Sequence, residues 1–351
     1  MNIMNAEKTI VLSVPLKNAE KIRKYLREKN LLRNDLEIQR DEKFVYFPII
    51  ERFKELTSYT TTEKQFKKKE IKPKSYKEIL KVDKKIKQGL PSSYDIVGDI
   101  ALIKLPKNII SQQKEIGQAI IKSNKNIKTV CIVEPVSGEF RVRKVKVITG
   151  EKRTRTTHKE YGLTFDVDIE NTYFSPRLAT ERKRVANQVK PGEIVVDMFA
   201  GVAPFSIMIA RYAKPKIIYV VDKNKKAVEL AKKNIKKNNV LDKIEVIHAD
   251  AKELDKILRV KSDRIIMNLP FSAHKFFTSA LKIAKDFCKI HYYDVSKEDK
   301  IQDRINYLKK ISEKENFVLT NIETRKIKTY APREFYIGID ITARKKHADV
   351  A

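Results

Sequence analysis

Four acidic or amide side chains stand at the ends of apolar runs in the second half of the chain. Asp197, Asp222, Asp250 and Asn268 each close a run of mostly apolar and β-branched residues. Such runs are typical of buried parallel strands, whose carboxyl ends meet at the sheet edge where ligands bind. An acid closing the second strand accepts hydrogen bonds from both ribose hydroxyls, and the next acid takes the amine of an adenine. We therefore expect a nucleoside-containing cofactor at this edge.

The residues after the first of these acids predict a tight turn that feeds a helix N-terminus. The turn residues expected to contact the cofactor are Asp197, Phe199, Ala200, Gly201 and Val202. Beyond the third strand, Ala251 joins Asp250 in the same set. The full glycine fingerprint of a dinucleotide-binding enzyme is absent from this turn.

The fourth run ends in Asn268–Leu269–Pro270–Phe271. An amide, an apolar residue, a proline and an aromatic ring in this order resemble the signature of methyltransferases that act on planar nitrogens. In those enzymes the amide and the backbone carbonyls hold the ring edge, and the aromatic side chain stacks on the ring. Taken in order, the four strand ends favour an S-adenosylmethionine-dependent methyltransferase.

Composition points to a polyanionic partner. The 351 residues carry 75 Lys and Arg against 45 Asp and Glu, a net charge of +30. A field of this sign attracts nucleic acid, and we expect no membrane binding because there is no Trp and no apolar run approaches the roughly 20 residues of a spanning helix. Cys131 and Cys288 are too few for a disulfide framework, are expected to be buried, and fit the reducing cytoplasm.

The elements divide into three parts: residues 1–72, 73–165 and 166–351. The first two read as small α+β units and the last as a Rossmann-like α/β domain. The basic run 64–74 is expected to be a linker, or alternatively a segment that binds phosphates along a nucleic-acid backbone. A single helix is expected over 76–86. A strand over 140–148 alternates apolar residues with cations, which would form one basic face.

The catalytic part is expected to begin with a helix whose start is marked by Ser175–Pro176, with Ser175 as its N-cap. Leu178, Val185 and Val189 would face the core. Further elements expected are a helix over 274–287, a strand over 290–295, a helix over 299–314 and a closing strand pair up to residue 341. No coiled-coil seam is evident, so a monomer is expected.

These residues resemble archaeal tRNA (guanine-37-N1)-methyltransferases over essentially the whole chain. The matching stretches are 138–143 (GEFRVR), 173–178 (YFSPRL), Glu181–Arg182, 197–202 (DMFAGV), 268–270 (NLP) with His274 and Phe276, and 330–334 (YAPRE). The resemblance implies a class I methyltransferase domain behind two RNA-binding domains. The N-terminal domain would touch the outer corner of the tRNA, and the target would be the guanine 3′ to the anticodon.

Residue roles follow from the same resemblance. It implies that Glu181 is the general base, that Arg141 binds the guanine O6, and that Asn268 holds the base. The substrate-binding residues implied are Tyr173, Arg177, Arg182, Pro270 and Phe271. The chemistry agrees, because guanine N1 is a poor nucleophile until a carboxylate removes its proton and a cation stabilises the charge developing on O6. The methyl donor is a sulfonium, so no metal is expected.

Two positions depart from the family pattern. Ala203 stands where the turn commonly has glycine, which is tolerated if its φ is negative. Phe271 replaces a residue that is often basic, and an aromatic ring there suits a bulkier purine. It raises the hypothesis of a second methylation, on the tricyclic guanine derivative of the wyosine pathway.

Three alternatives stay open at this point. A tRNA aminocarboxypropyl transferase would use the same donor but move a different group, and it usually lacks the N-terminal domain. A catalytically silent RNA-binding protein would not need Glu181, Asp222 and Asn268 together. An RNA methyltransferase acting on an exocyclic amine would need the Asn-Leu-Pro-Phe stretch but no general base.

Overall fold

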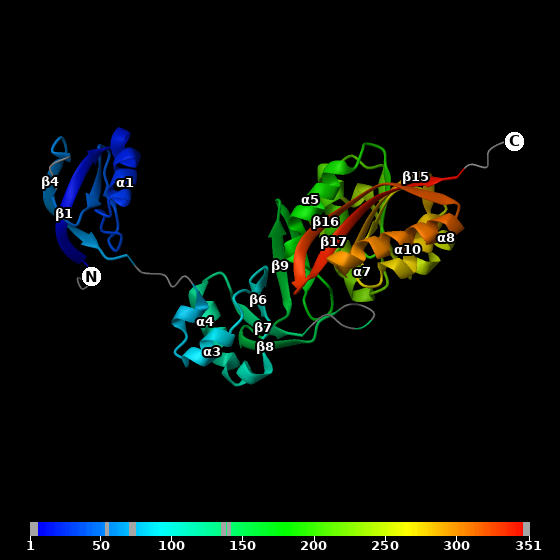
Figure 1. Ribbon diagram of the computed structural model, residues 1–351, viewed down its shortest axis with the longest axis horizontal. Coiled ribbons are helices and arrows are strands. Elements are labelled where there is room, and N and C mark those ends of the chain that lie inside the picture. Colours follow the sequence, from blue (N-terminus) through cyan, green and yellow to red (C-terminus); the bar gives the residue numbers. More distant parts are fainter. Residues whose placement is uncertain (1–5, 53–55, 70–74, 135–137, 139–141, 347–351) are drawn as a thin grey trace. The chain divides into compact units, whose positions relative to one another are not determined.

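The computed structural model describes residues 6–52, 56–69, 75–134, 138 and 142–346. It divides into two compact units, residues 1–74 and 75–351 (Figure 1). Within the described residues, no helix is both long enough and apolar enough to cross a membrane.

The first unit is an antiparallel sheet with one covering helix. Its strands β1 (Ala6–Pro15), β2 (Gln39–Arg40), β3 (Phe44–Pro48) and β4 (Thr60–Lys67) lie in the order β2-β3-β1-β4. Helix α1 (Ala19–Glu28) buries Ile22 and Leu26 against this sheet.

The linker expected over 64–74 is wrong for its first part. Residues up to Lys67 belong to β4, which pairs along β1 from Ala6↔Lys67 to Ser13↔Thr60. The alternation that fits a strand is hidden in the sequence because most of β4 is exposed and polar, with only Phe66 buried. Residues 70–74 lie outside the described part.

The second unit begins with a four-stranded sheet covered by helices. Strands β5 (Asp95–Val97), β6 (Ile100–Ile103), β7 (Thr129–Val133) and β8 (Val145–Gly150) lie in that order, with α4 (Gln113–Ser123) against β7 and β8. The single helix expected over 76–86 is wrong: α2 (Tyr76–Ile79) ends where Leu80 becomes extended, and α3 (Lys84–Gly89) follows. Of the strand expected over 140–148, residues 140 and 141 lie outside the described part, and β8 begins at Val145.

A seven-stranded sheet forms the centre of the same unit. Its order is β13-β12-β11-β14-β15-β17-β16. The strands are β11 (Ile194–Asp197), β12 (Ile217–Asp222), β13 (Ile244–His248), β14 (Ser262–Met267), β15 (Ala284–Lys297), β16 (Phe317–Ala331) and β17 (Glu334–Lys345). The pairs from β13 to β15 are parallel, and β17 is antiparallel to both β15 and β16, so the expected Rossmann-like sheet with a closing antiparallel edge is confirmed.

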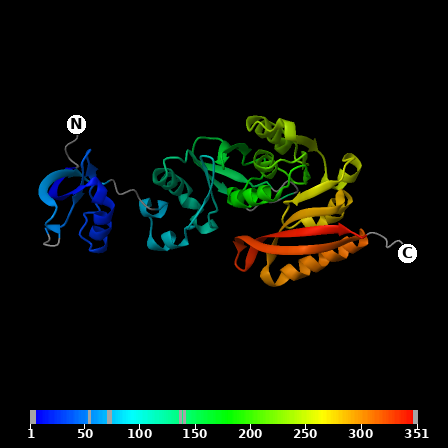
Figure 2. The same ribbon diagram turned by 90° about the horizontal axis from the view of Figure 1, so that it is seen from above.

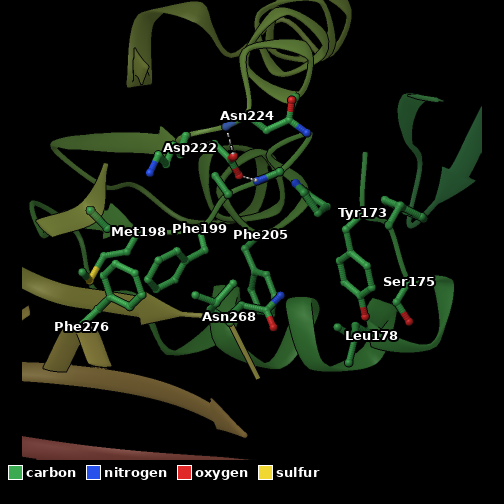
Figure 3. Close-up of a pocket in the computed structure, with 18 of the residues that line it drawn as sticks. Tyr173, Ser175, Leu178, Met198, Phe199, Phe205, Asp222, Asn224, Asn268 and Phe276 are labelled. Atoms are coloured by element: carbon green, nitrogen blue, oxygen red, sulfur yellow. Dashed lines mark hydrogen bonds between the residues drawn. The ribbon is translucent and has the colours of Figure 1, made fainter. Parts of the chain in front are cut away.

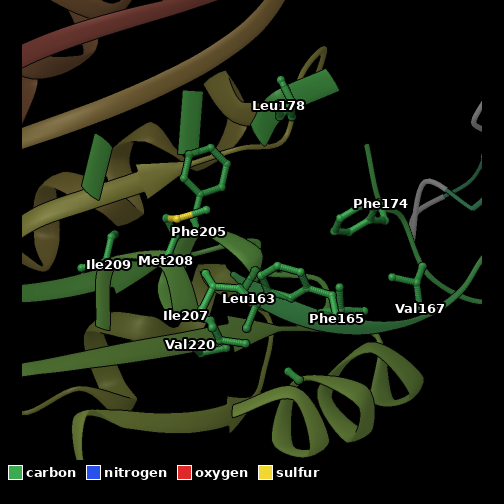
Figure 4. Close-up of a cluster of buried hydrophobic side chains, with 14 of the residues drawn as sticks. Leu163, Phe165, Val167, Phe174, Leu178, Phe205, Ile207, Met208, Ile209 and Val220 are labelled. Atoms are coloured by element: carbon green, nitrogen blue, oxygen red, sulfur yellow. The ribbon is translucent and has the colours of Figure 1, made fainter. Parts of the chain in front are cut away.

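Alternation along the buried strands divides the core between the two faces of the sheet. Val195 packs in one cluster and Val196 in the other, as successive strand residues must. The first cluster joins the sheet to α5 (Ala179–Gln188), α6 (Pro204–Tyr212) and α7 (Lys225–Lys237) (Figure 4). The second packs against α8 (Leu254–Ile257), α9 (Phe277–Lys282) and α10 (Ile301–Lys314), and α10 runs along β16 (Figure 2).

A two-stranded hairpin, β9 (Arg155–Glu160) and β10 (Leu163–Asp168), leads into the site. Asn234 of α7 and Asn238, the C-cap of that helix, bind the backbone of the hairpin: their Oδ1 atoms accept from the N–H groups of Asp166 and Thr164 at 2.7 and 2.9 Å. The side-chain amides thereby fix the hairpin to the end of α7, while its two strands pair only with each other.

Helix starts and ends differ from expectation in two places. Ser175 is the N-cap residue of the 3₁₀ turn η4 (Pro176–Leu178), with Pro176 in its first turn, as predicted. Its side chain, however, makes no capping bond and instead accepts from Lys328 Nζ at 3.2 Å. The helix expected over 274–287 ends with α9 at Lys282, and the chain from Ala284 already pairs in β15. Leu178, Val185 and Val189 are buried, as predicted.

Candidate active site

A cavity opens at the carboxyl ends of β11, β12, β13 and β14, where the sequence predicts a cofactor. We call it the strand-end cavity. Phe199 and Phe276 line one end of it and Tyr173 the other (Figure 3), and the first two rings meet edge to face with centroids 5.0 Å apart. The predicted cofactor residues that line it are Phe199, Ala200, Gly201, Asp222, Asp250, Ala251 and Asn268.

Asp222 holds the turn of β11 from the end of the neighbouring strand. Its Oδ2 accepts from the Gly201 backbone N–H at 2.7 Å, and its Oδ1 accepts from the Asn224 N–H at 2.8 Å (Figure 3). Burial raises the pKa of this carboxyl, although these backbone donors act against the rise. The side chain lines the cavity while its carboxylate fixes the backbone beside it.

Asp250 occupies a more solvated position on the third strand end. It caps the 3₁₀ turn η6 (Ala251–Glu253) by accepting from the Lys252 N–H at 3.0 Å, and it pairs with Lys223 at 3.1 Å. Burial acts to raise the pKa of Asp250, but that backbone bond and the Lys223 ammonium lower it overall. The carboxylate is therefore ionised and lies beside an apolar wall made by Ala249 and Ala251.

Asp197 and Val202 lie behind the cavity rather than on its wall. Both are almost fully buried, and Asp197 Oδ2 accepts from the Ser206 hydroxyl at 2.8 Å. Burial raises the pKa of Asp197 to about 7, and the neighbouring Asp222 adds to the rise. Asp197 and Val202 therefore help to shape the turn. Whether they contact the cofactor stays a prediction.

Two non-glycine residues at the site adopt left-handed backbone. Ala203, the N-cap of α6, has a φ of 63°, so the condition under which the sequence tolerates alanine here, a negative φ, is not met. Phe271 has a φ of 69°. Such residues cost about 1–2 kcal/mol each and persist where their surroundings hold them, commonly at functional sites.

The Asn268–Phe271 stretch is held from two sides. The Tyr336 hydroxyl donates to Asn268 Oδ1, and the Phe271 N–H donates to Asp294 Oδ1 at 3.0 Å. Asp294 is fully buried and also pairs with Arg304 at 2.7 Å. These bonds fix the amide at the mouth of the cavity and leave the Phe271 ring 43% exposed.

A second cavity adjoins the first, and Tyr173 lines both. It is walled by the aromatic rings of Tyr94, Tyr330 and Tyr336 and by the cationic side chains of Lys104, Arg143, Arg177 and Lys328. Aromatic faces and cations together are what a splayed-out nucleotide requires. Arg177 also pairs with Asp95 of β5 at 2.5 Å, which ties the 173–178 loop to the four-stranded sheet.

Arg182, predicted to bind substrate, is an internal support. Only 1% of it is exposed, and it forms a bidentate pair with Glu160 at 2.7 and 2.5 Å. Its guanidinium also donates twice to the Ser175 carbonyl at 3.2 Å. Arg182 therefore joins the β9–β10 hairpin to the 173–178 loop. It is also one of the residues that line the strand-end cavity.

Glu181 lies outside both cavities. Its carboxylate accepts from the Tyr293 hydroxyl at 2.8 Å and pairs with Arg184 at 2.7 and 2.8 Å and with Arg325 at 3.2 and 3.4 Å. Burial acts to raise the pKa of Glu181, but the two guanidinium groups lower it overall. The predicted base is thus ionised and turned toward β15, β16 and β17.

Of the remaining predicted site residues, the structure describes Pro270 but not Arg141. Arg141 lies outside the described residues. Pro270 is buried beside Asn268. Sequence reasoning missed Tyr293, Arg184, Arg325, Asp340 and Tyr336, because their contacts join elements far apart in the chain; Tyr330 was in a matching stretch but had no role assigned.

Family models match three successive parts of the chain. The TRM5/TYW2 methyltransferase domain matches residues 156–320, the TYW2 N-terminal domain matches 76–154, and the tRNA methyltransferase 5 N-terminal domain matches 12–57. The order corresponds to the seven-stranded sheet with its hairpin, the four-stranded sheet, and the first compact unit.

Relatives of known activity are similar over nearly the full length. The tRNA (guanine(37)-N(1))-methyltransferase Trm5b of Pyrococcus abyssi is 37% identical over 95% of this chain and 98% of its own. The solved complex of aTrm5 and tRNALeu superposes with a TM-score of 0.75 at 38% identity, covering 95% of this chain and 99% of that one.

A second group of relatives lacks part of this length. The tRNA(Phe) (4-demethylwyosine(37)-C(7)) aminocarboxypropyltransferase of Methanocaldococcus jannaschii is 36% identical but matches 70% of this chain. The structure of M. jannaschii TYW2 in complex with AdoMet has a TM-score of 0.56 at 30% identity and covers 72% of this chain and 100% of that one. The likeness that spans all three parts is to the guanine-N1 enzymes, and the chain belongs to the archaeal tRNA (guanine(37)-N(1))-methyltransferase family, the Trm5 branch of the TRM5/TYW2 methyltransferases.

Proposed function

We propose that this protein transfers the methyl group of S-adenosylmethionine to N1 of guanine 37, 3′ to the anticodon of tRNA. The observation that carries the proposal is the junction of two cavities at Tyr173. One has the strand-end carboxylates and apolar walls that suit an adenosyl group, and the other has the rings and cations that suit a nucleotide.

The strand-end cavity fits the methyl donor. Asp222, at the end of the second strand, would hold the ribose, and Asp250 would take the adenine amine. Phe199, Phe276 and Leu269 supply the apolar slot that a purine ring requires. When bound, S-adenosylmethionine supplies a methyl group on a sulfonium centre.

The residues on the guanine side have to hold the base and move one proton. The Asn268 amide and the adjoining backbone would hold the ring edge, with Tyr173 and Arg177 beside it. Glu181 would accept the N1 proton, and Arg141 would stabilise the charge on O6. Because Glu181 is turned toward β15–β17 in this structure, its carboxylate has to change partners when the base enters.

The rest of the chain would grip the tRNA. The net charge of +30 supports a polyanionic partner, and we propose that residues 1–72 contact the outer corner while 73–165 and 166–351 contact the anticodon arm. We further propose a monomer acting in the cytoplasm, consistent with Cys131 and Cys288 being buried thiols whose pKa is raised by burial.

The test is labelled methyl transfer to an unmodified tRNA transcript with guanine at position 37, beside its adenine-37 variant. We expect label on guanine N1 alone, and a loss of about 10²–10⁴-fold in rate for Glu181→Gln with donor binding retained. Transfer to the adenine variant, or an unaffected Glu181→Gln, would contradict the proposed reaction. Methyl label recovered in methylthioadenosine, with an unlabelled four-carbon fragment added to the tRNA, would instead indicate aminocarboxypropyl transfer.

One observation favours a second substrate. Residues Phe271 and Tyr330 are each 43% exposed, and their rings meet edge to face with centroids 5.4 Å apart, beside the Asn268 stretch. An aromatic pair of this kind can stack on a wider ring than guanine. We propose that the protein also transfers a methyl group to tRNA carrying demethylwyosine. Phe271→Lys should weaken this transfer more than it weakens transfer to guanine 37. No transfer to the demethylwyosine tRNA would refute the proposal.

A further inference from the structure

The Arg325 side chain links the predicted base to the edge of the sheet. Arg325 Nη2 lies 3.2 Å from Glu181 Oε1 and 2.6 Å from Asp340 Oδ1. Arg184 also bridges Glu181 and Asp340, at 2.7 and 2.8 Å. The two guanidinium groups therefore hold the two carboxylates in one cluster, and Arg325 makes the longer contacts to Glu181.

The strand opposite Arg325 is built to seat its guanidinium. Gly338 of β17 is the register partner of Arg325, and a Cβ added at Gly338 would lie 3.1 Å from Arg325 Nη2 and 3.4 Å from its Nε. Such contacts are tighter than real side chains normally accept. The glycine thus leaves the space through which Arg325 crosses β17 toward Glu181.

The cluster continues into the core behind Asp340. His291 Nδ1 lies 2.6 Å from Asp340 Oδ1, and His291 Nε2 lies 2.7 Å from Arg264, which pairs with Glu193. The groups facing Glu181 are thus Arg184 from α5, Tyr293 from β15, Arg325 from β16 and, through the guanidiniums, Asp340 from β17. Asp340 is anchored from behind and cannot follow a moving Glu181.

Strand β16 carries both Arg325 and residues that line the second cavity, the one proposed to hold the nucleotide. Lys328 and Tyr330 line that cavity, and the pairing of β16 with β17 shifts register between Lys326 and Lys328 and again after Thr329. We propose that Arg325, seated over Gly338, is a positioning residue that sets the orientation and charge of Glu181 for proton removal. This inference rests on the proposed role of Glu181 as the base.

The measurement is the pH dependence of single-turnover methyl transfer, with enzyme in excess over the guanine-37 transcript. Arg325→Gln removes a cation that lowers the pKa of Glu181, so its rate should fall most at acid pH. We expect a loss of about tenfold at the acid end of the profile and about threefold or less at pH 8.

Three matched variants divide the possible causes. Arg325→Lys keeps the charge and should restore the acid limb, while Gly338→Ala keeps every charged group and should produce a smaller shift in the same direction by displacing the guanidinium. Glu181→Gln should have no acid limb and little rate. Donor binding and thermal unfolding of each variant identify any that is misfolded.

The two proposals fail in different ways. A uniform rate loss in Arg325→Gln with an unshifted acid limb, while Glu181→Gln is inactive, would overturn the positioning role and leave the base in place. An active Glu181→Gln would overturn both. A shifted limb that Arg325→Lys restores would support the inference.

Discussion

The two sides of the site treat their buried carboxylates in opposite ways. On the donor side, burial raises the pKa of Asp197 and Asp222, and their partners are a hydroxyl and backbone N–H groups. Around Glu181, the Arg184 and Arg325 guanidiniums overcome the burial and lower the pKa of Glu181. Burial also acts to raise the pKa of Asp340, but His291 first and then the same two guanidiniums lower it overall. The buried donor-side acids Asp197 and Asp222 are thus held by a hydroxyl and by backbone N–H groups, while Asp250 at the solvated edge pairs with Lys223. In the Glu181 cluster, both acids pair with guanidinium groups.

This difference matches the charges that each side has to handle. A sulfonium donor is a cation, so acids that lack a cationic partner favour it electrostatically. A general base has to be ionised at neutral pH, and the paired guanidiniums lower the pKa of Glu181, the proposed base, and so keep it ionised. The comparison therefore predicts that charge changes on the two sides have different consequences.

The largest effect is expected at Arg182, which follows Glu181 in α5 and also lines the strand-end cavity. Replacing it in Arg182→Met leaves Glu160 buried without its partner, which should lower the free energy of unfolding by about 3–5 kcal/mol. Denaturant unfolding measures this. The double variant Arg182→Met/Glu160→Leu should recover most of the stability but not the activity, because the Ser175 carbonyl still loses both of its donors. A loss below about 1 kcal/mol in the single variant would contradict the buried pair.

The sequence predicted the donor side far better than the side around Glu181. Asp222 and Asp250 end apolar runs, and sheet geometry alone brings such residues together. The Glu181 cluster joins α5 to β15, β16 and β17 through side chains separated by 112 to 156 residues. No local pattern encodes such contacts, so only the resemblance pointed to Glu181.

Backbone conformation was also beyond the sequence. Ala203 is a residue type that rarely adopts positive φ, and nothing in its neighbours signals that the turn requires it. The exposed strand β4 was missed for the related reason that its alternation is weak. Long apolar strands were predicted well because burial on both faces leaves a strong pattern.

The second prediction concerns the pH dependence of stability on the donor side. Because the pKa of Asp197 rises from 3.8 to about 7 on folding, the folded state keeps a proton that the unfolded state loses, and stability falls as pH rises from about 4 to about 7. Asp197→Asn should remove this decline and gain up to about 4 kcal/mol at pH 8 relative to wild type. Urea unfolding across this range is the measurement. A decline of equal slope in the variant would mean that another group carries it.

The third prediction tests whether donor binding depends on Asp222 more than on Asp250. Asp222→Asn disturbs two backbone hydrogen bonds and the proposed ribose contact, and we expect donor affinity to fall about 100-fold. Asp250→Asn, at the more solvated edge, should cost about tenfold. Calorimetric titration with S-adenosylmethionine gives both values. Binding of tRNA should be unchanged in each variant, and a matching loss there would show that the two sides are not independent.

The smallest effect is expected at Ala203, where two contributions oppose each other. Ala203→Gly relieves a left-handed backbone that costs alanine about 1–2 kcal/mol. It also removes a fully buried methyl group, worth about 0.8 kcal/mol, and increases the freedom of the unfolded chain by a similar amount. The free energy of unfolding should therefore change by less than about 1 kcal/mol, whereas Ala203→Val, with a branched side chain in the same backbone, should cost more than about 2 kcal/mol. Unfolding curves for the two variants decide between backbone strain and packing. A large gain in the free energy of unfolding for Ala203→Gly would mean that the turn stores strain. A large loss would mean that packing of the methyl group stabilises the turn.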